Sequence, residues 1–238
     1  MINHVFLEKP ASIFRNGRAF AITADIALDR TQITWRVPGC LKGPLRARVA
    51  QAEPDTLDDP DTLADQSRWL ESLLGLGNGA VTWTLAVGYN YPAGVVELLP
   101  DEPAVFNKDC ESDAEILRGA NPQSRVDRFR NLPFYAGVFC GKAIVSECFH
   151  NGNGAVTVHT DGRYQNRGYA SSCLRIVTDR TLKAGIVPGF GTRFDNVAAR
   201  ALAERCGYVL RGLSYWVEIP GNDYAQLPPE VRTSLEQE

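Results

Sequence analysis

The residues with the clearest chemical potential lie in a polar segment, Thr160 to Ala170. A β-branched run at 155–160 leads into it, and apolar residues at helical spacing follow it, so the segment is predicted to join a strand to a helix. The first turn of a helix carries unpaired backbone N–H groups and the positive end of the helix dipole. Gly168 lets a ligand approach these groups closely. The segment is therefore predicted to bind an anion, most simply a phosphate.

A second segment adds a strand and a helix further along the chain. The run 185–190 is predicted to be a strand. Asn196 is a good N-cap residue for a helix over 196–206, and Gly207 is a good residue to end that helix. The two segments together predict a strand–helix–strand–helix order in which the polar turn follows the first strand.

These segments resemble the GNAT superfamily of acyl-CoA N-acyltransferases, whose pyrophosphate loop reads Gln or Arg, two residues, Gly, one residue, Gly or Ala. Gln165, Gly168 and Ala170 fit that loop, and Asn196 with the pair Gly207-Tyr208 resembles the family's closing signature. The resemblance implies acetyl-CoA as cosubstrate, with the Thr160 backbone pairing with the pantetheine arm and Asn196 contacting it further along. The implied pyrophosphate cradle consists of Gln165, Asn166, Arg167, Gly168, Tyr169 and Ala170.

The reaction implied by the resemblance is direct attack of an amine on the thioester, without a covalent enzyme intermediate. It needs a base, donors for the oxyanion and, to a lesser degree, an acid for the departing thiolate. Glu147 is the leading candidate base, because alternation places it on an apolar strand face, and His159 is the second. The family's usual tyrosine acid is replaced by Ala203, so Tyr208, Tyr215 or a water would have to serve.

Composition limits the class of protein. The chain has 238 residues, 44% of them hydrophobic, and a net charge of −3, so bulk charge gives no reason for binding nucleic acid or an anionic membrane. The six cysteines show no C-x-x-C spacing and are predicted to be reduced, and the three histidines are too scattered to suggest a metal site. The sequence shows neither a signal peptide nor an apolar stretch long enough to span a membrane, which predicts a cytoplasmic protein.

The chain is predicted to divide into an N-terminal lobe, 1–121, and a catalytic domain, 122–238. The lobe has no phosphate loop, and it is interpreted as structural or as a cover for the acceptor site; its element order is compatible with a degenerate second GNAT-like half. Its predicted elements are strands over 19–26, 32–37, 80–87 and 94–99 and helices around 69–74 and over 111–118.

The catalytic domain begins after a polar stretch, 119–131, which is interpreted as the domain boundary. Its last residues, 220–238, are predicted to be a loosely packed tail. The whole is expected to be an α+β protein with a GNAT-like mixed, mostly antiparallel sheet flanked by helices, and with an N-terminal α/β lobe. The predicted strands of this domain are 134–139, 142–149, 155–160, 185–190 and 208–219.

The sequence thus predicts an N-acetyltransferase that acts on a primary amine of a small molecule, as a monomer or homodimer without a membrane partner. One alternative keeps the fold but takes an aminoacyl-tRNA or a carrier-protein thioester as donor. It would need a basic groove, for which Arg118, Arg125, Arg128 and Arg130 are candidates. A further alternative is a non-catalytic sensor of acyl-CoA.

Overall fold

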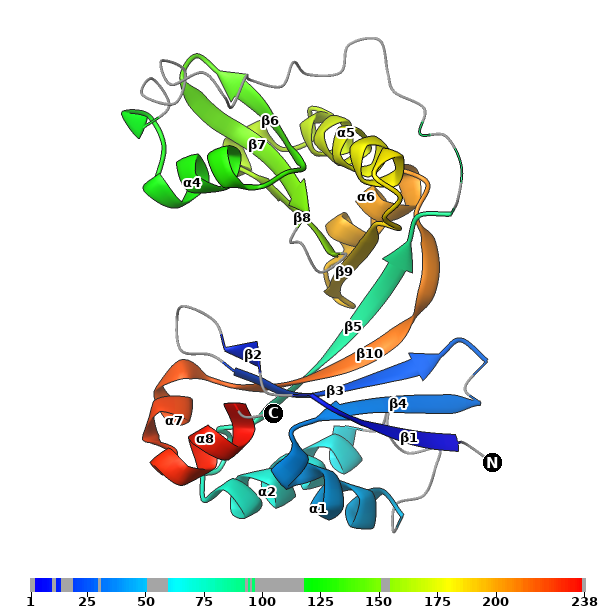
Figure 1. The fold of residues 1–238 in the computed structure, drawn as a ribbon, viewed down its shortest axis with the longest axis vertical. Coiled ribbons are helices and arrows are strands. Elements are labelled where there is room, and N and C mark those ends of the chain that lie inside the picture. Colours follow the sequence, from blue (N-terminus) through cyan, green and yellow to red (C-terminus); the bar gives the residue numbers. More distant parts are fainter. Residues whose placement is uncertain are drawn as a thin grey trace. The chain divides into compact units, whose positions relative to one another are not determined.

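The computed structural model describes residues 3–9, 12–13, 19–29, 31–50, 60–92, 94, 96, 118–150 and 155–236. The chain forms two compact units (Figure 1). Unit 1 comprises Met1–Val87 and Arg211–Glu238, and unit 2 comprises Gly88–Leu210. The chain passes from unit 1 to unit 2 within β5 (Thr82–Asn90) and returns within β10 (Val209–Ile219).

The sheet of unit 1 has the order β1-β4-β3-β10-β5, with β2 (Ser12–Ile13) paired to β3. The predicted hairpin of β3 (Ala19–Ala27) and β4 (Gln32–Val37) is confirmed as an antiparallel pair. Asp29 shapes its turn, because its Oδ1 accepts both the N–H and the hydroxyl of Thr31, at 3.0 and 2.8 Å. β1 (Asn3–Glu8) runs parallel to β4, so the lobe is a mixed sheet.

Helices cover one face of this sheet (Figure 1). They are α1 (Gly39–Val49), α2 (Pro60–Leu74), α7 (Gly221–Gln226) and α8 (Pro229–Glu236). The prediction of a loose C-terminal tail is wrong: Tyr224, Leu227 and Leu235 are buried in the core of unit 1. Three apolar side chains in an otherwise polar stretch are enough to pack two short helices against the sheet, because each of these side chains loses most of its contact with water.

The sheet of unit 2 has the order β5-β9-β8-β7-β6. β6 (Tyr135–Cys140), β7 (Ala143–His150) and β8 (Ala155–Thr160) form the predicted antiparallel meander. β9 (Gly189–Arg193) is parallel to β8 and starts later than predicted. The cause is Gly185, whose left-handed backbone (φ +75°) ends the preceding helix, so that the N–H of Ile186 still bonds to Thr181.

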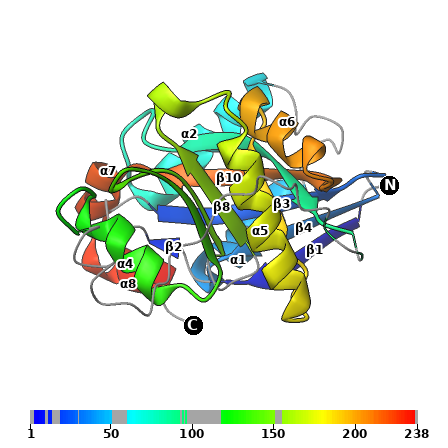
Figure 2. The same ribbon diagram turned by 90° about the horizontal axis from the view of Figure 1, so that it is seen from above.

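Two helices pack on opposite sides of the meander (Figure 2). α5 (Tyr169–Lys183) runs along one side and α4 (Gln123–Asn131) along the other. Residues 119–131, interpreted as a polar domain boundary, contain α4, whose Val126 and Phe129 are fully buried against Tyr135, Ile144 and Phe149. The apolar pair at i and i+3 fastens this polar helix to the sheet.

The observed fold confirms the predicted α+β class with a mixed, mostly antiparallel sheet flanked by helices. The units differ in extent from the predicted ranges 1–121 and 122–238, because β10 returns residues 211–219 to the sheet of unit 1. The predicted strand over 94–99 and the predicted helix over 111–118 lie almost entirely outside the described residues.

Candidate functional site

Residues 165–170, here named the phosphate loop, connect the short 3-10 helix η1 (Gly162–Tyr164) to α5. Asn166 and Gly168 both have left-handed backbones, with φ +59° and +81°. Gly168 is the N-cap of α5 and has no side chain with which to bond the first N–H groups of the helix. The open N-terminus of a helix after a left-handed turn is a favourable place for an anion.

The space beside Gly168 is open, because a Cβ added there would meet nothing within 4 Å. The side chain of Arg167 lies over the Tyr164 ring at 5.2 Å, and one of its nitrogens is 3.4 Å from the carbonyl of Arg163. Gln165, Asn166 and Arg167 are exposed. The loop therefore presents backbone N–H groups and positive charge to solvent, as an incoming pyrophosphate requires.

β8 and β9 pair at only two positions, Ala155 with Gly189 and Val156 with Phe190. Beyond Val156 the two parallel strands have no further register in the described chain, although β8 continues to Thr160. The N–H of Asp161 bonds to Val145, so by alternation Val158 and Thr160 direct their backbone groups away from β7. The β8 edge that leads to the phosphate loop is thus available for an extended ligand to pair with.

The side chain of Thr160 is occupied on another side, because its hydroxyl lies 2.8 Å from the hydroxyl of Ser146. Asn196 is confirmed as the N-cap of α6 (Val197–Arg205), and its Oδ1 accepts the N–H of Ala199 at 3.1 Å. Its predicted contact with a ligand would have to coexist with this capping bond. Thr160 and Asn196 both have a structural role that is independent of any ligand.

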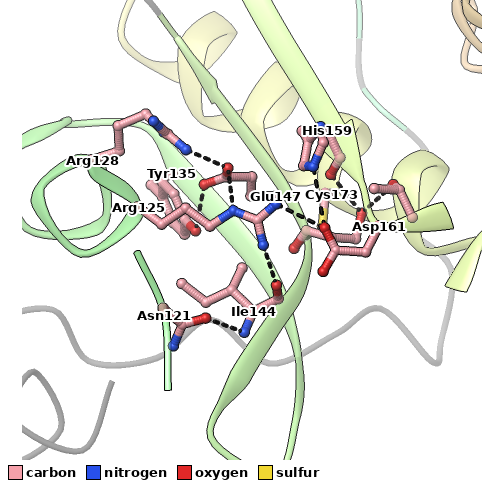
Figure 3. Close-up of polar contacts among 11 residues, drawn as sticks. Asn121, Arg125, Arg128, Tyr135, Ile144, Glu147, His159, Asp161 and Cys173 are labelled. Carbon is pink, nitrogen blue, oxygen red and sulfur yellow. Dashed lines mark hydrogen bonds and ion pairs between the residues drawn. The ribbon is translucent and has the colours of Figure 1, made fainter. Parts of the chain in front are cut away.

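Glu147 shares its strand face with the buried apolar side chain of Phe149, as alternation predicts, but its carboxylate lies inside a polar network (Figure 3). Its carboxylate lies 2.6 Å from Arg128 Nη2 and 3.3 Å from Arg125 Nε, and it accepts the hydroxyl of Tyr135 at 3.1 Å. Only 1% of its side chain is exposed. Two guanidinium groups and a phenol surround the carboxylate, and an amine cannot reach it from solvent in this conformation.

His159 and Asp161 lie near the same network, at the end of β8 (Figure 3). The Nε2 atom of His159 is 3.2 Å from Asp161 Oδ1, and 54% of the imidazole side chain is exposed. Asp161 Oδ1 also accepts Arg125 Nη2 at 2.9 Å. This hydrogen bond from Arg125 is the main cause that lowers the pKa of the Asp161 carboxyl, so Asp161 is charged near neutral pH.

Tyr208 lies in the interior of unit 2, where its hydroxyl is 2.7 Å from Thr178 Oγ1. The Thr178 hydroxyl donates to the Leu174 carbonyl, so the Tyr208 hydroxyl donates to Thr178. Burial raises the pKa of Tyr208, which disfavours loss of its proton. Nothing in this arrangement brings the phenol to the phosphate loop or to the free edge of β8.

The structure adds two residues that sequence reasoning did not single out for this site, Asp161 and, as its partner, Arg125. Asp161 could have been found from alternation, since residues i and i+2 of a strand share a face and His159 was already a candidate. Arg125 and Arg128 were assigned only to a basic groove. In unit 2 both donate hydrogen bonds to carboxylates, Arg125 to Asp161 and Arg128 to Glu147, and the basic groove stays a prediction.

Within the described residues, no three His, Cys, Asp or Glu side chains are grouped so as to hold a metal ion. The five cysteines in this part of the chain are free thiols. None of the described helices is long and apolar enough to cross a membrane. The site is therefore described by its backbone edge, its phosphate loop and the polar network beside them.

Comparison with protein families gives a match between residues 95–208 and the Acetyltransferase (GNAT) family. The matched segment contains the meander, the phosphate loop, β9 and α6. A search of proteins with curated functions finds no match to this chain.

Solved structures that resemble the chain include a GCN5-related N-acetyltransferase-like protein from Streptococcus suis, with 14% identity, 88% of each chain covered and a TM-score of 0.46. A GCN5-related N-acetyltransferase from Sphaerobacter thermophilus has 13% identity and a TM-score of 0.44, with 85% of this chain and 80% of that chain covered. A GNAT-family acetyltransferase from Colwellia psychrerythraea has 14% identity and a TM-score of 0.41, with 58% of this chain and 56% of that chain covered. At such identities and scores, these likenesses carry no argument about substrates.

Proposed function

Because residues 95–208 match the Acetyltransferase (GNAT) family, we propose that the protein transfers the acetyl group of acetyl-CoA to a primary amine of a small molecule. The observation that carries the proposal is the continuity between two features of unit 2. In the described part of the chain β9 does not pair with β8 beyond Val156, and β8 leads directly into the phosphate loop and the N-terminus of α5. An extended ligand with a pyrophosphate at one end matches this combination.

In this proposal the pyrophosphate of acetyl-CoA lies against the N–H groups of residues 168–171, with Arg163 and Arg167 adding positive charge. The pantetheine arm then pairs with the backbone of Thr160 and Val158, as an added strand would. The thioester reaches the part of β8 where β9 diverges. A backbone N–H at that edge is a suitable donor for the oxyanion that forms when an amine attacks the thioester carbonyl.

The transfer itself is written without a covalent intermediate on the protein. The amine nitrogen attacks the carbonyl carbon, the C–N bond forms, and the C–S bond then breaks to release CoA. The amine must be neutral when it attacks, so a base near the thioester contributes to the rate. A thiolate is a good leaving group, so the reaction does not depend on a strong acid at the tyrosine position that Ala203 occupies.

A thermal-shift titration with acetyl-CoA tests the donor site in wild type, Gly168→Ala and Gly185→Ala. Both glycines have left-handed backbones, with φ +81° and +75°, and a Cβ meets nothing within 4 Å at either, so the two variants carry a similar strain of about 1–2 kcal/mol. Only the Cβ at position 168 would enter the proposed cradle.

In wild type, ligand at about 100 times its Kd is expected to add about 2.7 kcal/mol of stability, which raises Tm by about 5–10 °C. We expect Gly185→Ala to keep this shift and Gly168→Ala to lose most of it. No shift in wild type would refute acetyl-CoA as the donor, and an equal shift in both variants would refute the phosphate loop as its site.

A further inference from the structure

His159 lies where the free edge of β8 and the polar network meet (Figure 3). It stands between Val158 and Thr160, whose backbone groups face away from β7 along that edge. Its register partner on β7 is Glu147, so its side chain points to the face of the sheet on which α4 packs. With 54% of its side chain exposed, the imidazole is open to a solute, whereas Glu147 is closed off.

Asp161 lies on the same side of the sheet as His159. Its carboxylate is paired with the guanidinium group of Arg125. Arg125 donates Nη2 to Asp161 Oδ1 at 2.9 Å and Nη1 to the Ile144 carbonyl at 2.6 Å, and its Nε lies 3.3 Å from Glu147. Only 13% of the Arg125 side chain is exposed. Two acceptors on β7 and Asp161, just after β8, therefore fix the position of the guanidinium, and the guanidinium in turn fixes the Asp161 carboxylate.

The same carboxylate oxygen of Asp161 meets the imidazole, at 3.2 Å from Nε2. An ionised carboxylate can only accept, so the neutral imidazole donates its Nε2–H to Asp161 and keeps an unprotonated Nδ1. The charged groups beside His159 are Asp161, which it contacts, Glu147, its register partner on β7, and Arg125, which contacts Asp161. Since Glu147 is also paired with Arg128, Asp161 is the carboxylate that acts directly on the ring.

Resting on the proposed function, we infer that His159 Nδ1 is the proton acceptor of the transfer and that Asp161 and Arg125 are its positioning residues. The acceptor ammonium gives one proton to Nδ1 and becomes a neutral amine. The amine attacks the thioester carbonyl, the C–N bond forms and the C–S bond breaks. The second proton leaves the nitrogen for the departing thiolate, giving the amide, CoA and an imidazolium that returns its proton to water.

The tautomer of His159 provides a direct test that needs no acceptor. In the protein labelled with ¹⁵N in its histidine rings, each of the three imidazoles reports which nitrogen carries the proton. The missing signal in His159→Gln assigns the ring. Neutral His159 is expected to be protonated at Nε2 in wild type and to lose this preference in Asp161→Asn. A ring protonated at Nδ1 in wild type would overturn the inference.

Kinetics with acetyl-CoA and three probe amines, glycine, ethanolamine and 2-phenylethylamine, test the same assignment by activity. His159→Gln is expected to lower kcat/KM by roughly 100-fold or more, and to remove the acid limb of the pH–rate profile. Asp161→Asn and Arg125→Lys should each cost on the order of tenfold, mainly in kcat, because the imidazole remains but is poorly held. Lys183→Gln, which removes an exposed ion pair with Asp179 on α5, is the control and should leave the rate unchanged.

The acetyl-CoA thermal shift separates failure of the inference from failure of the proposed function. If wild type shows no shift, the donor assignment fails. If wild type and His159→Gln shift equally and are equally active, the donor site stands and the inference is refuted. If none of the probe amines is acetylated, the tautomer measurement alone decides the inference.

Discussion

The two faces of the β6–β8 meander both pack buried apolar side chains, but they differ in the ionisable groups that are buried among them. On the α5 face, Cys148, Cys173 and Thr178 are buried and neutral, and burial raises the pKa of the Cys148 thiol. On the α4 face, Glu147 is equally buried and lies between two arginines. The α4 face, which also packs Phe129 and Phe149, thus holds a buried ion-pair network close to the end of the strand that leads to the phosphate loop.

This difference indicates that the two faces of the sheet in unit 2 have different structural roles. The α5 face must hold the helix N-terminus in place, and neutral packing does this without directional requirements. The α4 face holds groups whose positions matter individually, because each ion pair fixes both of its partners. The polar network extends from Glu147 through Arg125 to Asp161 and so reaches the exposed imidazole of His159.

The largest effect is expected from Glu147→Ala, which leaves Arg128 and the Tyr135 hydroxyl without their shared partner. Breaking a buried ion pair costs about 3–5 kcal/mol. Urea unfolding followed by circular dichroism measures the loss; tryptophan fluorescence is less suitable because all four tryptophans belong to unit 1. Glu147→Gln keeps an acceptor and should lose less. A loss below about 1 kcal/mol for Glu147→Ala would contradict a role for charge in this face.

On the neutral face, Leu174→Ala is expected to cost about 3 kcal/mol, because Leu174 is fully buried in α5 and its truncation leaves a cavity. The same urea experiment applies. Leu174→Met conserves volume and should cost less than about 1.5 kcal/mol. Equal losses for the two variants would show that this face does not depend on close packing.

Tyr208→Phe should cost only about 1 kcal/mol, because it removes one neutral hydrogen bond while Thr178 keeps its bond to Leu174. Acetyl transfer to the probe amines should persist in this variant. The comparison of kcat for Tyr208→Phe and wild type checks the acid role predicted from the sequence. A loss of kcat by a factor of a hundred would restore that role.

The smallest expected effect is the contribution of the Arg125–Asp161 pair to the free energy of unfolding at acid pH. Arg125 lowers the pKa of Asp161 below its usual 3.8, so the pair contributes stability that is present above that value. The contribution is lost as pH falls through the lower pKa of the folded state. Since 38% of the Asp161 side chain is exposed, it should stay below about 1 kcal/mol.

The unfolding free energies of wild type and Asp161→Asn, measured across pH, provide the check. Their difference should be constant above about pH 5 and should shrink below about pH 4. A difference that instead grows on acidification would mean that the Asp161 carboxyl is stabilised in its protonated form.

Much of the fold could be predicted from local pattern. The β3–β4 hairpin, the meander, the Asn196 cap and the helix end at Gly207 each depend on residues close together in the sequence, and the structure confirms them. The α4 helix and the C-terminal helices were missed, since a few apolar side chains in a polar stretch give a weak local signal. Their burial depends on a sheet surface formed by distant residues.

By itself the sequence determined the order of strand, turn and helix around the phosphate loop. The left-handed turn at Gly168 and the helical spacing of the apolar residues in α5 depend only on residues that are close in the sequence. Only the tertiary structure decided which side chains meet. Glu147 and Arg128 are 19 residues apart and Arg125 and Asp161 are 36 apart. Such pairs form when α4 packs on the sheet. Strand alternation alone predicts which face of the sheet a residue lies on, but it does not predict which charged side chain packs against that residue.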